Sequence, residues 1–406
     1  MYSYFKNNIA EYDVLISDLF NLSNNYALTD EFVFCSITVP FDHESQARSL
    51  PEDSEIKVRN AIKDCISQIS ELDEHKHLRI EIEAQLEGLA KNIDTNYEGY
   101  GIYLVFDVSE KTLHKAIKPG KPHPAMAYFT AVPLVKCSIP SLYIGSDFKY
   151  IDIINNYQND YNTLVMVVHE DKLNAYTLRQ DRIEEFGQVF NDYAKYTEAE
   201  AYNDERSPDQ MGTHGNRTDK EYTKDYVRKF VQDNIHDFLT RIQDIFDVVV
   251  LLYSDRFDDN VKGLIGETEK KFPNVVANRE IPDTVEHIKQ SALDLTDSLS
   301  RKELEAEVAA VLDKQSYEFE LNTIIEALIQ SKVAKIYISI DYAQSGFVTQ
   351  DYQPIVQTDD DSVEVDDIAP YIIQATIEQG GEVMIADQSI LSKFEKKAGI
   401  VAELRY

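Results

Sequence analysis

The chain has 406 residues, of which 72 are acidic and 40 basic, and its formal net charge is -32. A protein this acidic repels phosphate over most of its surface, which excludes one that coats nucleic acid broadly but allows one that contacts RNA at a few points. With 43% hydrophobic residues it should be globular, and its length suggests about two to three domains.

Cysteine usage and hydropathy indicate the compartment. Cys35, Cys65 and Cys137 are far apart and lie in apolar runs, which is typical of buried thiols in a reducing cytoplasm. The start of the chain lacks the apolar stretch of a signal peptide, and a run of about 18 apolar residues occurs nowhere. We expect a cytoplasmic protein without disulfides, cysteine-based zinc sites or membrane contacts.

The first segment, residues 1–157, is expected to be a mixed α/β domain. After a helical start, the alternating residues 32–40 predict a strand. Apolar residues at three- and four-residue spacing over 56–89 predict two helices. Strands are expected again over 101–108 and 127–137.

The stretch between the last two strands, residues 111–123, contains no acidic residue, and we call it the basic segment. Pro119-Gly120 and Pro122 indicate a turn, and lysines at a loop tip suit contact with the phosphates of folded RNA. The alternative is a solvated hairpin tip that balances nearby carboxylates. The candidate RNA contacts are Lys111, His114, Lys115, Lys118, Lys121 and His123.

The second segment, residues 158–281, opens with expected strands over 164–168 and 173–178. A polar loop, residues 191–218, follows, and loops of this length in compact domains are usually functional or disordered. The capping box from Thr218 to Glu221 then predicts a helix that begins at Asp219 and runs for roughly 40 Å. A buried strand over 248–253 and a helix over 261–271 complete the segment.

His214 is the candidate general base of this loop. It lies between Gly212 and Gly215, and a flexible loop can present an imidazole near its neutral pKa. The glycines can equally serve flexibility alone. Because the sequence fixes no carboxylate beside His214, contact of the loop with a partner is favoured over catalysis.

The third segment, residues 282–406, is expected to be an α/β sandwich. A helix is predicted over 284–299, and Ser300 to Glu303 is a second capping-box signal that lies in this helix or after it. The other predicted elements are helices around 321–330, 368–379 and 390–397 and strands over 333–340, 382–386 and 400–404.

Motifs for cofactor or nucleotide chemistry are missing from the sequence. It has no Gly-x-x-x-x-Gly-Lys-Ser/Thr, no Gly-x-Gly-x-x-Gly after a strand and no Gly-x-Ser-x-Gly. His75 and His77 would diverge by about 200° on a helix and cannot readily share a metal ion. We therefore expect no nucleotide hydrolysis, no cofactor and no metal.

Several stretches match one family in order. The ending, residues 380–385 and 398–406, the helix-and-strand pair 323–328 and 333–338, and the opening 164–178 resemble Pelota and the class-one release factors of archaea and eukaryotes, together with their bacterial relatives. The long loop before Asp219 lies where the release factors carry Gly-Gly-Gln. The resemblance covers nearly the whole chain and implies three mixed α/β domains with a tRNA-mimicking outline.

The loop departs from the family pattern. Gly212-Thr213-His214-Gly215 stands in place of Gly-Gly-Gln, and the first segment has no Asn-Ile-Lys-Ser stop-codon motif. Release requires a tight loop that places water at the peptidyl-tRNA ester. The resemblance therefore implies a hibernation factor that occupies the ribosomal A site without chemistry, is delivered by elongation factor Tu, and is a monomer off the ribosome.

Within that resemblance, the basic segment would contact 16S rRNA at the decoding centre, and the third domain would face the factor-binding side. A peptidyl-transferase-centre loop would approach 23S rRNA through Met211, Gly212, Thr213, His214, Gly215, Asn216 and Arg217. Three alternatives stay open. These are a ribosome-rescue or peptide-release factor, a peptidyl-tRNA hydrolase or nuclease that uses His214, and an acidic scaffold without ribosome contact.

Overall fold

The fold is taken from a computed structural model of the chain. It describes residues 9–26, 31–40, 60, 82, 99–109, 125–134, 140–158, 161–169, 172–179, 182–190, 227–242, 245–257, 259–356 and 362–406. Contacts group the chain into two compact units. The central unit is Asp160–Glu303 with Met1–Asn7, and the split unit is Asn8–Asn159 with Leu304–Tyr406.

The central unit contains a five-stranded sheet of order β7-β6-β5-β8-β9. Antiparallel pairing joins β5, β6 and β7, whereas β5, β8 and β9 are parallel. Every residue of β5 and β8 is buried, as expected for strands covered on both faces. The strands are β5 (Thr163–Val168), β6 (Lys172–Arg179), β7 (Arg182–Phe190), β8 (Val248–Tyr253) and β9 (Val275–Asn278).

Helices cover both faces of this sheet. Residues 227–242 are helical, with a π-helical turn at Gln232–His236 followed by α9 (Asp237–Ile242), and they pack with α10 (Asp259–Lys271) on one face. The beginning of α11 packs on the other face through Ile288 and Ala292. The predicted start at Asp219 lies outside the described residues.

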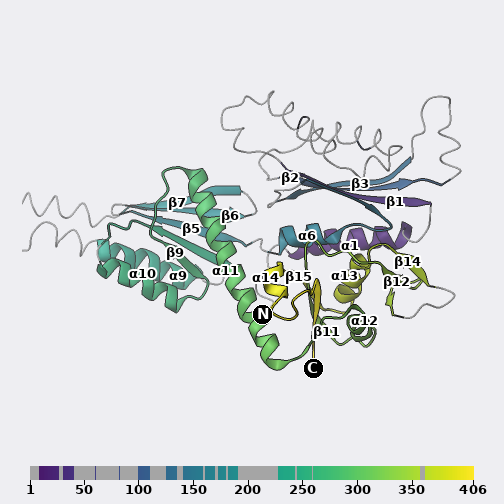
Figure 1. The fold of residues 1–406 in the computed structure, drawn as a ribbon. Coiled ribbons are helices and arrows are strands. Elements are labelled where there is room, and N and C mark those ends of the chain that lie inside the picture. The colour runs from purple at the N-terminus through teal and green to yellow at the C-terminus, as the bar shows by residue number, and fades with distance from the viewer. Residues whose placement is uncertain are drawn as a thin grey trace, which may run out of the picture. The chain divides into compact units, whose positions relative to one another are not determined.

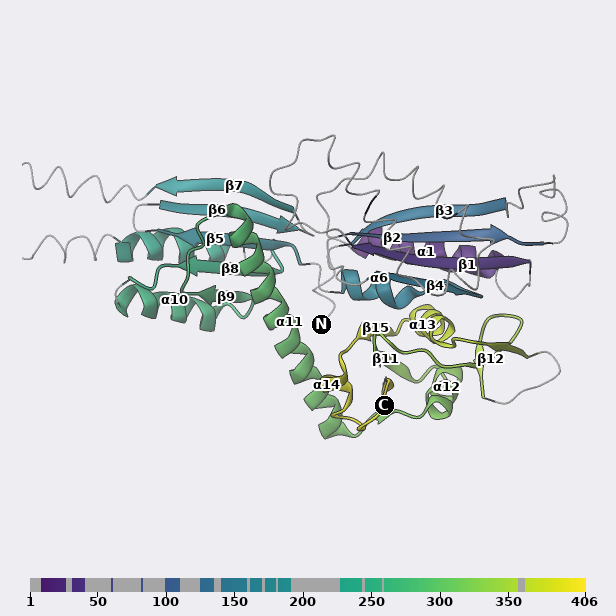
Figure 2. The same cartoon turned by 45° about the horizontal axis from the view of Figure 1, so that its top comes forward.

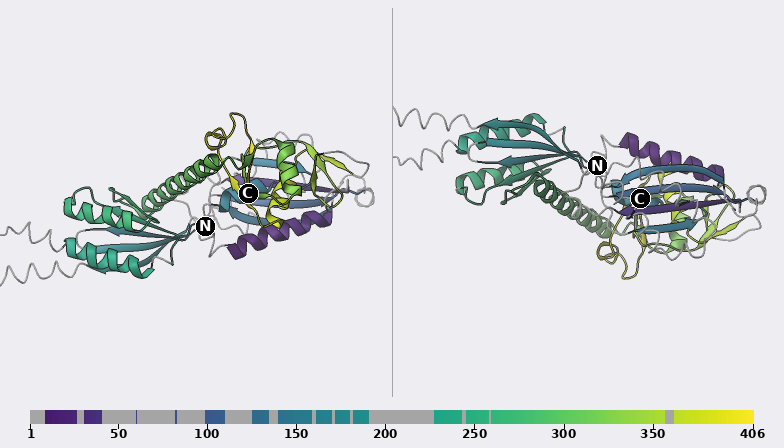
Figure 3. Two further views of the ribbon diagram at one scale, coloured as in Figure 1. Left: turned by 90° about the horizontal axis from the view of Figure 1, so that it is seen from below. Right: turned by 90° about the horizontal axis from the view of Figure 1, so that it is seen from above.

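The capping-box signal at Ser300 is not a helix start. A single helix, α11, runs from Val285 to Lys314, as Figure 3 shows from two sides. The helix contains neither glycine nor proline, so nothing in its backbone requires an end at Ser300. Buried Val308 and Val311 then pack in the split unit, which gives the later turns tertiary support.

The first part of the split unit is an antiparallel sheet of order β3-β2-β1-β4, which confirms the strands predicted over 32–40, 101–108 and 127–137. Two helices, α1 (Ile9–Tyr26) and α6 (Tyr150–Tyr157), lie along one face of it (Figure 1). The strands are β1 (Phe32–Pro40), β2 (Gly99–Asp107), β3 (Ala125–Leu134) and β4 (Ser141–Gly145).

The second part of the split unit contains a mixed sheet of order β10-β16-β11-β15 and a small sheet of order β13-β12-β14. The strands are β10 (Tyr317–Glu318), β11 (Val333–Ile338), β12 (Gly346–Val348), β13 (Pro354–Ile355), β14 (Val363–Val365), β15 (Glu382–Ile385) and β16 (Ile400–Leu404). The helices are α12 (Leu321–Ile329), α13 (Ala369–Glu378) and the short α14 (Gln388–Leu391), which ends earlier than predicted.

One apolar core joins the two parts of the split unit. It contains Leu19 and Phe20 of α1, Ile153 of α6, and Tyr371 and Ile372 of α13. Figure 2 shows α6 close to α13 and β15. Segments far apart in the sequence therefore fold together, and the division into independent domains at 157 and 281 stays a prediction.

The expected α/β class is confirmed, with several sheets covered by helices. Cys35 is a buried free thiol, as expected, while Cys65 and Cys137 lie outside the described residues. Among the described helices, none combines the length and apolar content that crossing a membrane requires.

Candidate functional site

Both predicted contact segments lie outside the described residues. These are the basic segment with Lys111, His114, Lys115, Lys118, Lys121 and His123, and the loop with Met211, Gly212, Thr213, His214, Gly215, Asn216 and Arg217. The structure does fix the strands on both sides of the basic segment. Asp107 at the end of β2 pairs with Ala125 at the start of β3, so both connections to the basic segment leave from one end of the sheet.

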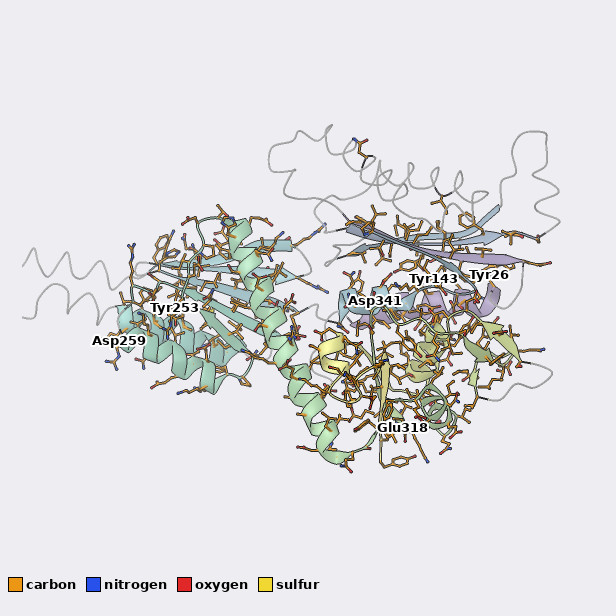
Figure 4. All side chains as sticks on the ribbon, in the orientation of Figure 1. Tyr26, Tyr143, Tyr253, Asp259, Glu318 and Asp341 are labelled. Carbon is orange, nitrogen blue, oxygen red and sulfur yellow. The ribbon has the colours of Figure 1, made fainter. Side chains whose placement is uncertain are left out.

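The described part of the chain contains a polar cluster, buried at its centre and partly exposed at its rim, where α1, β4, α6 and α13 meet, and we call it the polar junction. Its members lie inside the split unit, close to the apolar core. In Figure 4 the labelled Tyr143 and Asp341 lie at the level where these layers meet. The polar junction consists of Ser23, Asn24, Tyr143, Ser146, Asp147, Tyr150, Tyr352, Asp367, Tyr371 and Gln374.

Asp147 is the centre of the polar junction and is fully buried. Its Oδ1 accepts hydrogen bonds from the Phe148 backbone N–H at 2.6 Å and from the Tyr150 hydroxyl at 2.9 Å. Burial raises the pKa of Asp147 to about 7, although these hydrogen bonds act in the opposite direction. The acid is therefore neutral in a substantial fraction of molecules at physiological pH.

The second oxygen of Asp147, Oδ2, and the hydroxyl of Ser23 on α1 are both buried without a hydrogen-bond partner among the described residues. Ser23 lies close enough to Asp147 to lower the pKa of the acid, but burial outweighs this effect. An ionised Asp147 therefore keeps one buried oxygen without a donor.

Hydrogen bonds connect the two parts of the split unit around this acid. The hydroxyls of Ser146 and Tyr371 lie 3.4 Å apart, and either can donate. On α1, Asn24 accepts from the Tyr352 hydroxyl through its backbone oxygen at 2.9 Å and from Gln374 Nε2 through Oδ1 at 3.1 Å. The polar junction thus fixes how α1 and β4 pack on α13.

A further contact lies at the end of α6. Gln158 Nε2 donates to the Ile385 carbonyl at 3.0 Å, and the Ile385 N–H donates to Gln158 Oε1 at 2.7 Å. Both polar groups of one β15 residue are therefore bound by a single side chain from the first part of the unit.

A charge pair borders the polar junction. Lys149 Nζ lies 3.5 Å from Asp152 Oδ1 and also attracts Asp367. Burial nevertheless raises the pKa of both Asp152 and Asp367. Within the described residues Asp147 has no ion pair. Lys149, the nearest lysine in the sequence, pairs with Asp152 instead and leaves the charge of an ionised Asp147 uncompensated.

A second charged cluster anchors the end of α11 on β11. Lys335 Nζ contacts Glu307 Oε1 at 2.6 Å and Glu382 Oε2 at 2.8 Å. The Tyr337 hydroxyl lies 2.7 Å from Glu307 Oε1 and 3.1 Å from Glu403 Oε2, and its single proton can be donated to one of them at a time. Burial lowers the pKa of Lys335, but the hydrogen bonds to both carboxylates outweigh this effect and raise it overall.

Neither cluster has the geometry of a catalytic centre. Asp147 has no exposed surface, so a substrate cannot reach it in this structure. In the described ranges, no three His, Cys, Asp or Glu side chains are arranged to hold a metal ion. The described clusters position secondary-structure elements, and their chemistry is that of packing and proton binding.

The sequence offered little indication of the polar junction. A Ser146-Asp147 pair before a helix would ordinarily suggest helix capping, yet the Asp147 side chain binds the Phe148 N–H and Tyr150. Its remaining partners lie on α1 and near α13, far away in the sequence. The one usable signal was the density of tyrosines around an acid at a strand-to-helix turn.

Comparison with solved structures finds, among other proteins, Pelota, Dom34 and an archaeal termination factor. Pelota of Archaeoglobus fulgidus is 13% identical, with 70% of this chain and 77% of that chain covered and a TM-score of 0.33. Dom34 of S. cerevisiae, described as a translation termination-like factor, is 11% identical, with coverage of 76% and 79% and a TM-score of 0.35. The archaeal termination factor aRF1 is 12% identical, with coverage of 97% and 98% and a TM-score of 0.22.

Superposition is poor at these TM-scores, and none of these likenesses assigns a function to the chain. No protein-family model and no curated protein matches the sequence.

Proposed function

We propose that this chain is a ribosome-binding translation factor that occupies the A site and blocks translation without catalysing peptide release. The observation that carries the proposal is the ordered sequence resemblance. Its parts fall on elements of the expected type: residues 164–178 on β5 and β6, residues 323–328 on α12, residues 333–338 on β11, and residues 380–385 and 398–406 mostly on β15 and β16.

The basic segment supports contact with RNA. It supplies four lysines and two histidines without an acid, in a protein of net charge -32. The described residues on either side of it, Asp107 and Ala125, are paired at one end of a sheet. A few local cations are what an acidic protein needs to hold phosphate.

The loop composition supports a factor without hydrolytic activity. Gly212-Thr213-His214-Gly215 differs from Gly-Gly-Gln in the residue that would position water. Within the resembling family, this combination is most like Balon, a ribosome hibernation factor. We extend the proposal to delivery by elongation factor Tu and to action in the cytoplasm as a monomer off the ribosome.

Charge reversal in the basic segment tests ribosome binding. Replacing Lys115, Lys118 and Lys121 with Glu should abolish cosedimentation with 70S ribosomes at moderate salt and flatten the salt dependence that remains. The matched control replaces exposed Lys302, Lys396 and Lys397 with Glu, which changes the charge equally. Equal binding of both triple variants would contradict the assignment of the basic segment.

A release assay separates blocking from chemistry. Ribosomes with peptidyl-tRNA in the P site should retain the peptide when the wild-type protein is added, and His214→Ala should behave identically. Peptide release that His214→Ala abolishes would overturn the proposal in favour of the alternative, a release or rescue factor. A binding assay with elongation factor Tu tests the delivery partner separately.

A further inference from the structure

The split unit depends on a buried acid that lacks a cation. Asp147 has no ion pair within the described residues, and two core-forming parts of the chain meet around it. A buried carboxylate without a counter-charge is costly, whereas the same group as a neutral acid is a good hydrogen-bond donor. The stability of this contact should therefore depend on one proton.

We propose that Asp147 is a proton-operated latch: as a neutral acid it lets the α1/α6 layer pack on α13, and its ionisation places an uncompensated buried charge near Asp367 and weakens that contact. The inference goes beyond ribosome binding and does not depend on it. The latch involves only side chains of the polar junction.

Burial outweighs the hydrogen bonds that Asp147 accepts. Tyr150 on α6 donates to Oδ1 and favours the carboxylate, whereas burial and the like charge of Asp367, just before α13, favour the neutral acid. Burial, with Asp147 as a further cause, raises the pKa of Tyr143 on β4, Tyr371 on α13 and Tyr352, so these phenols stay neutral.

The direction of the pH dependence follows from the two forms. Asp147 has a pKa of about 7 when the junction is closed and would have the ordinary value of about 3.9 when it is open. The closed form binds the proton more tightly, so the equilibrium constant for closing is largest below about pH 4. This constant falls by about tenfold per pH unit as the pH rises toward 7 and stays constant above it.

A single tryptophan can report on this contact, because the chain contains none. Tyr352→Trp places the reporter where residue 352 meets α1. On this background, Asp147→Asn imitates the neutral acid. In urea titrations, it should be at least about tenfold more resistant to opening than its parent at pH 8 and within about fivefold of it at pH 4.5.

The matched control is Asp366→Asn, which removes the same charge from an exposed neighbouring position. It should give the same small difference from the parent at both pH values. The latch is overturned if Asp147→Asn and Asp366→Asn have the same pH profile, or if Asp147→Asn weakens the junction equally at both pH values.

Tyr150→Phe is an independent test if Asp147→Asn does not fold. The ring and its contact with Phe20 are kept, but the donor to Asp147 is lost, which penalises the carboxylate more than the acid. Resistance to urea should therefore fall more at pH 8 than at pH 4.5. An equal fall at both pH values would contradict the latch.

Discussion

The central unit and the split unit solve the packing problem differently. In the central unit, neighbouring segments form one sheet whose β5 and β8 are buried throughout, and two apolar clusters cover its faces. The split unit joins residues from both ends of the chain around a core bordered by buried polar groups. Local sequence therefore specifies the first unit well, while the second depends on long-range pairing of polar side chains.

Core truncation should show the difference most strongly. Ile372→Ala on α13 and Leu251→Ala on β8 each remove a fully buried side chain and should cost about 2–5 kcal/mol. Because its core is shared, Ile372→Ala should accelerate hydrogen exchange in both 9–26 and 369–378. Leu251→Ala should act on 163–190 instead.

Exchange that rises only within 304–406 in Ile372→Ala would show that the two parts of the split unit are separately stable. The comparison between the units would then fail.

Removing the cation of the charged cluster should give the next largest effect. Lys335→Ala leaves Glu307 and Glu382 without their shared partner, and we expect a loss of about 2–3 kcal/mol, because both carboxylates keep some solvent contact. The control Lys393→Ala removes a 3.8 Å pair between exposed groups and should stay within about 0.5 kcal/mol. Thermal unfolding measures both.

The smallest effect is expected from one hydroxyl at the rim of the polar junction. Tyr352→Phe loses the hydrogen bond to the Asn24 carbonyl and should cost about 1 kcal/mol, with faster exchange at the end of α1. The matched control is Tyr342→Phe, because the Tyr342 hydroxyl donates to Gln344 within its own segment. If both variants act equally on α1, the Tyr352 contact does not join the two parts.

Sequence patterns located the elements of the central unit because the relevant signals are local. Apolar runs predicted β5, β6 and β8, and the helix periodicity predicted α10. They missed β7, whose Glu184 and Glu185 are exposed at the edge of the sheet and break the apolar pattern. They also ended the predicted helix at Leu299, although α11 continues to Lys314, because sequence periodicity does not reveal the tertiary packing that continues a helix.

The polar junction was beyond sequence reasoning for a different reason. Asp147 gains its properties from burial beneath α1 and from Asp367, neither of which is close to it in the sequence. Composition gives the number of acidic residues in a chain but not which carboxyl group is buried away from water. The predicted RNA-contact segments, by contrast, stay predictions that depend on charge patterning and resemblance.

The two hydrogen bonds between Gln158 and Ile385 have a consequence for solubility. Strand β15 is at the edge of its sheet, and an open edge can recruit a strand from another molecule. The side-chain amide occupies both hydrogen-bonding groups of Ile385 and so blocks that growth point. A fragment that begins after residue 158 would lose this protection and should be prone to self-association.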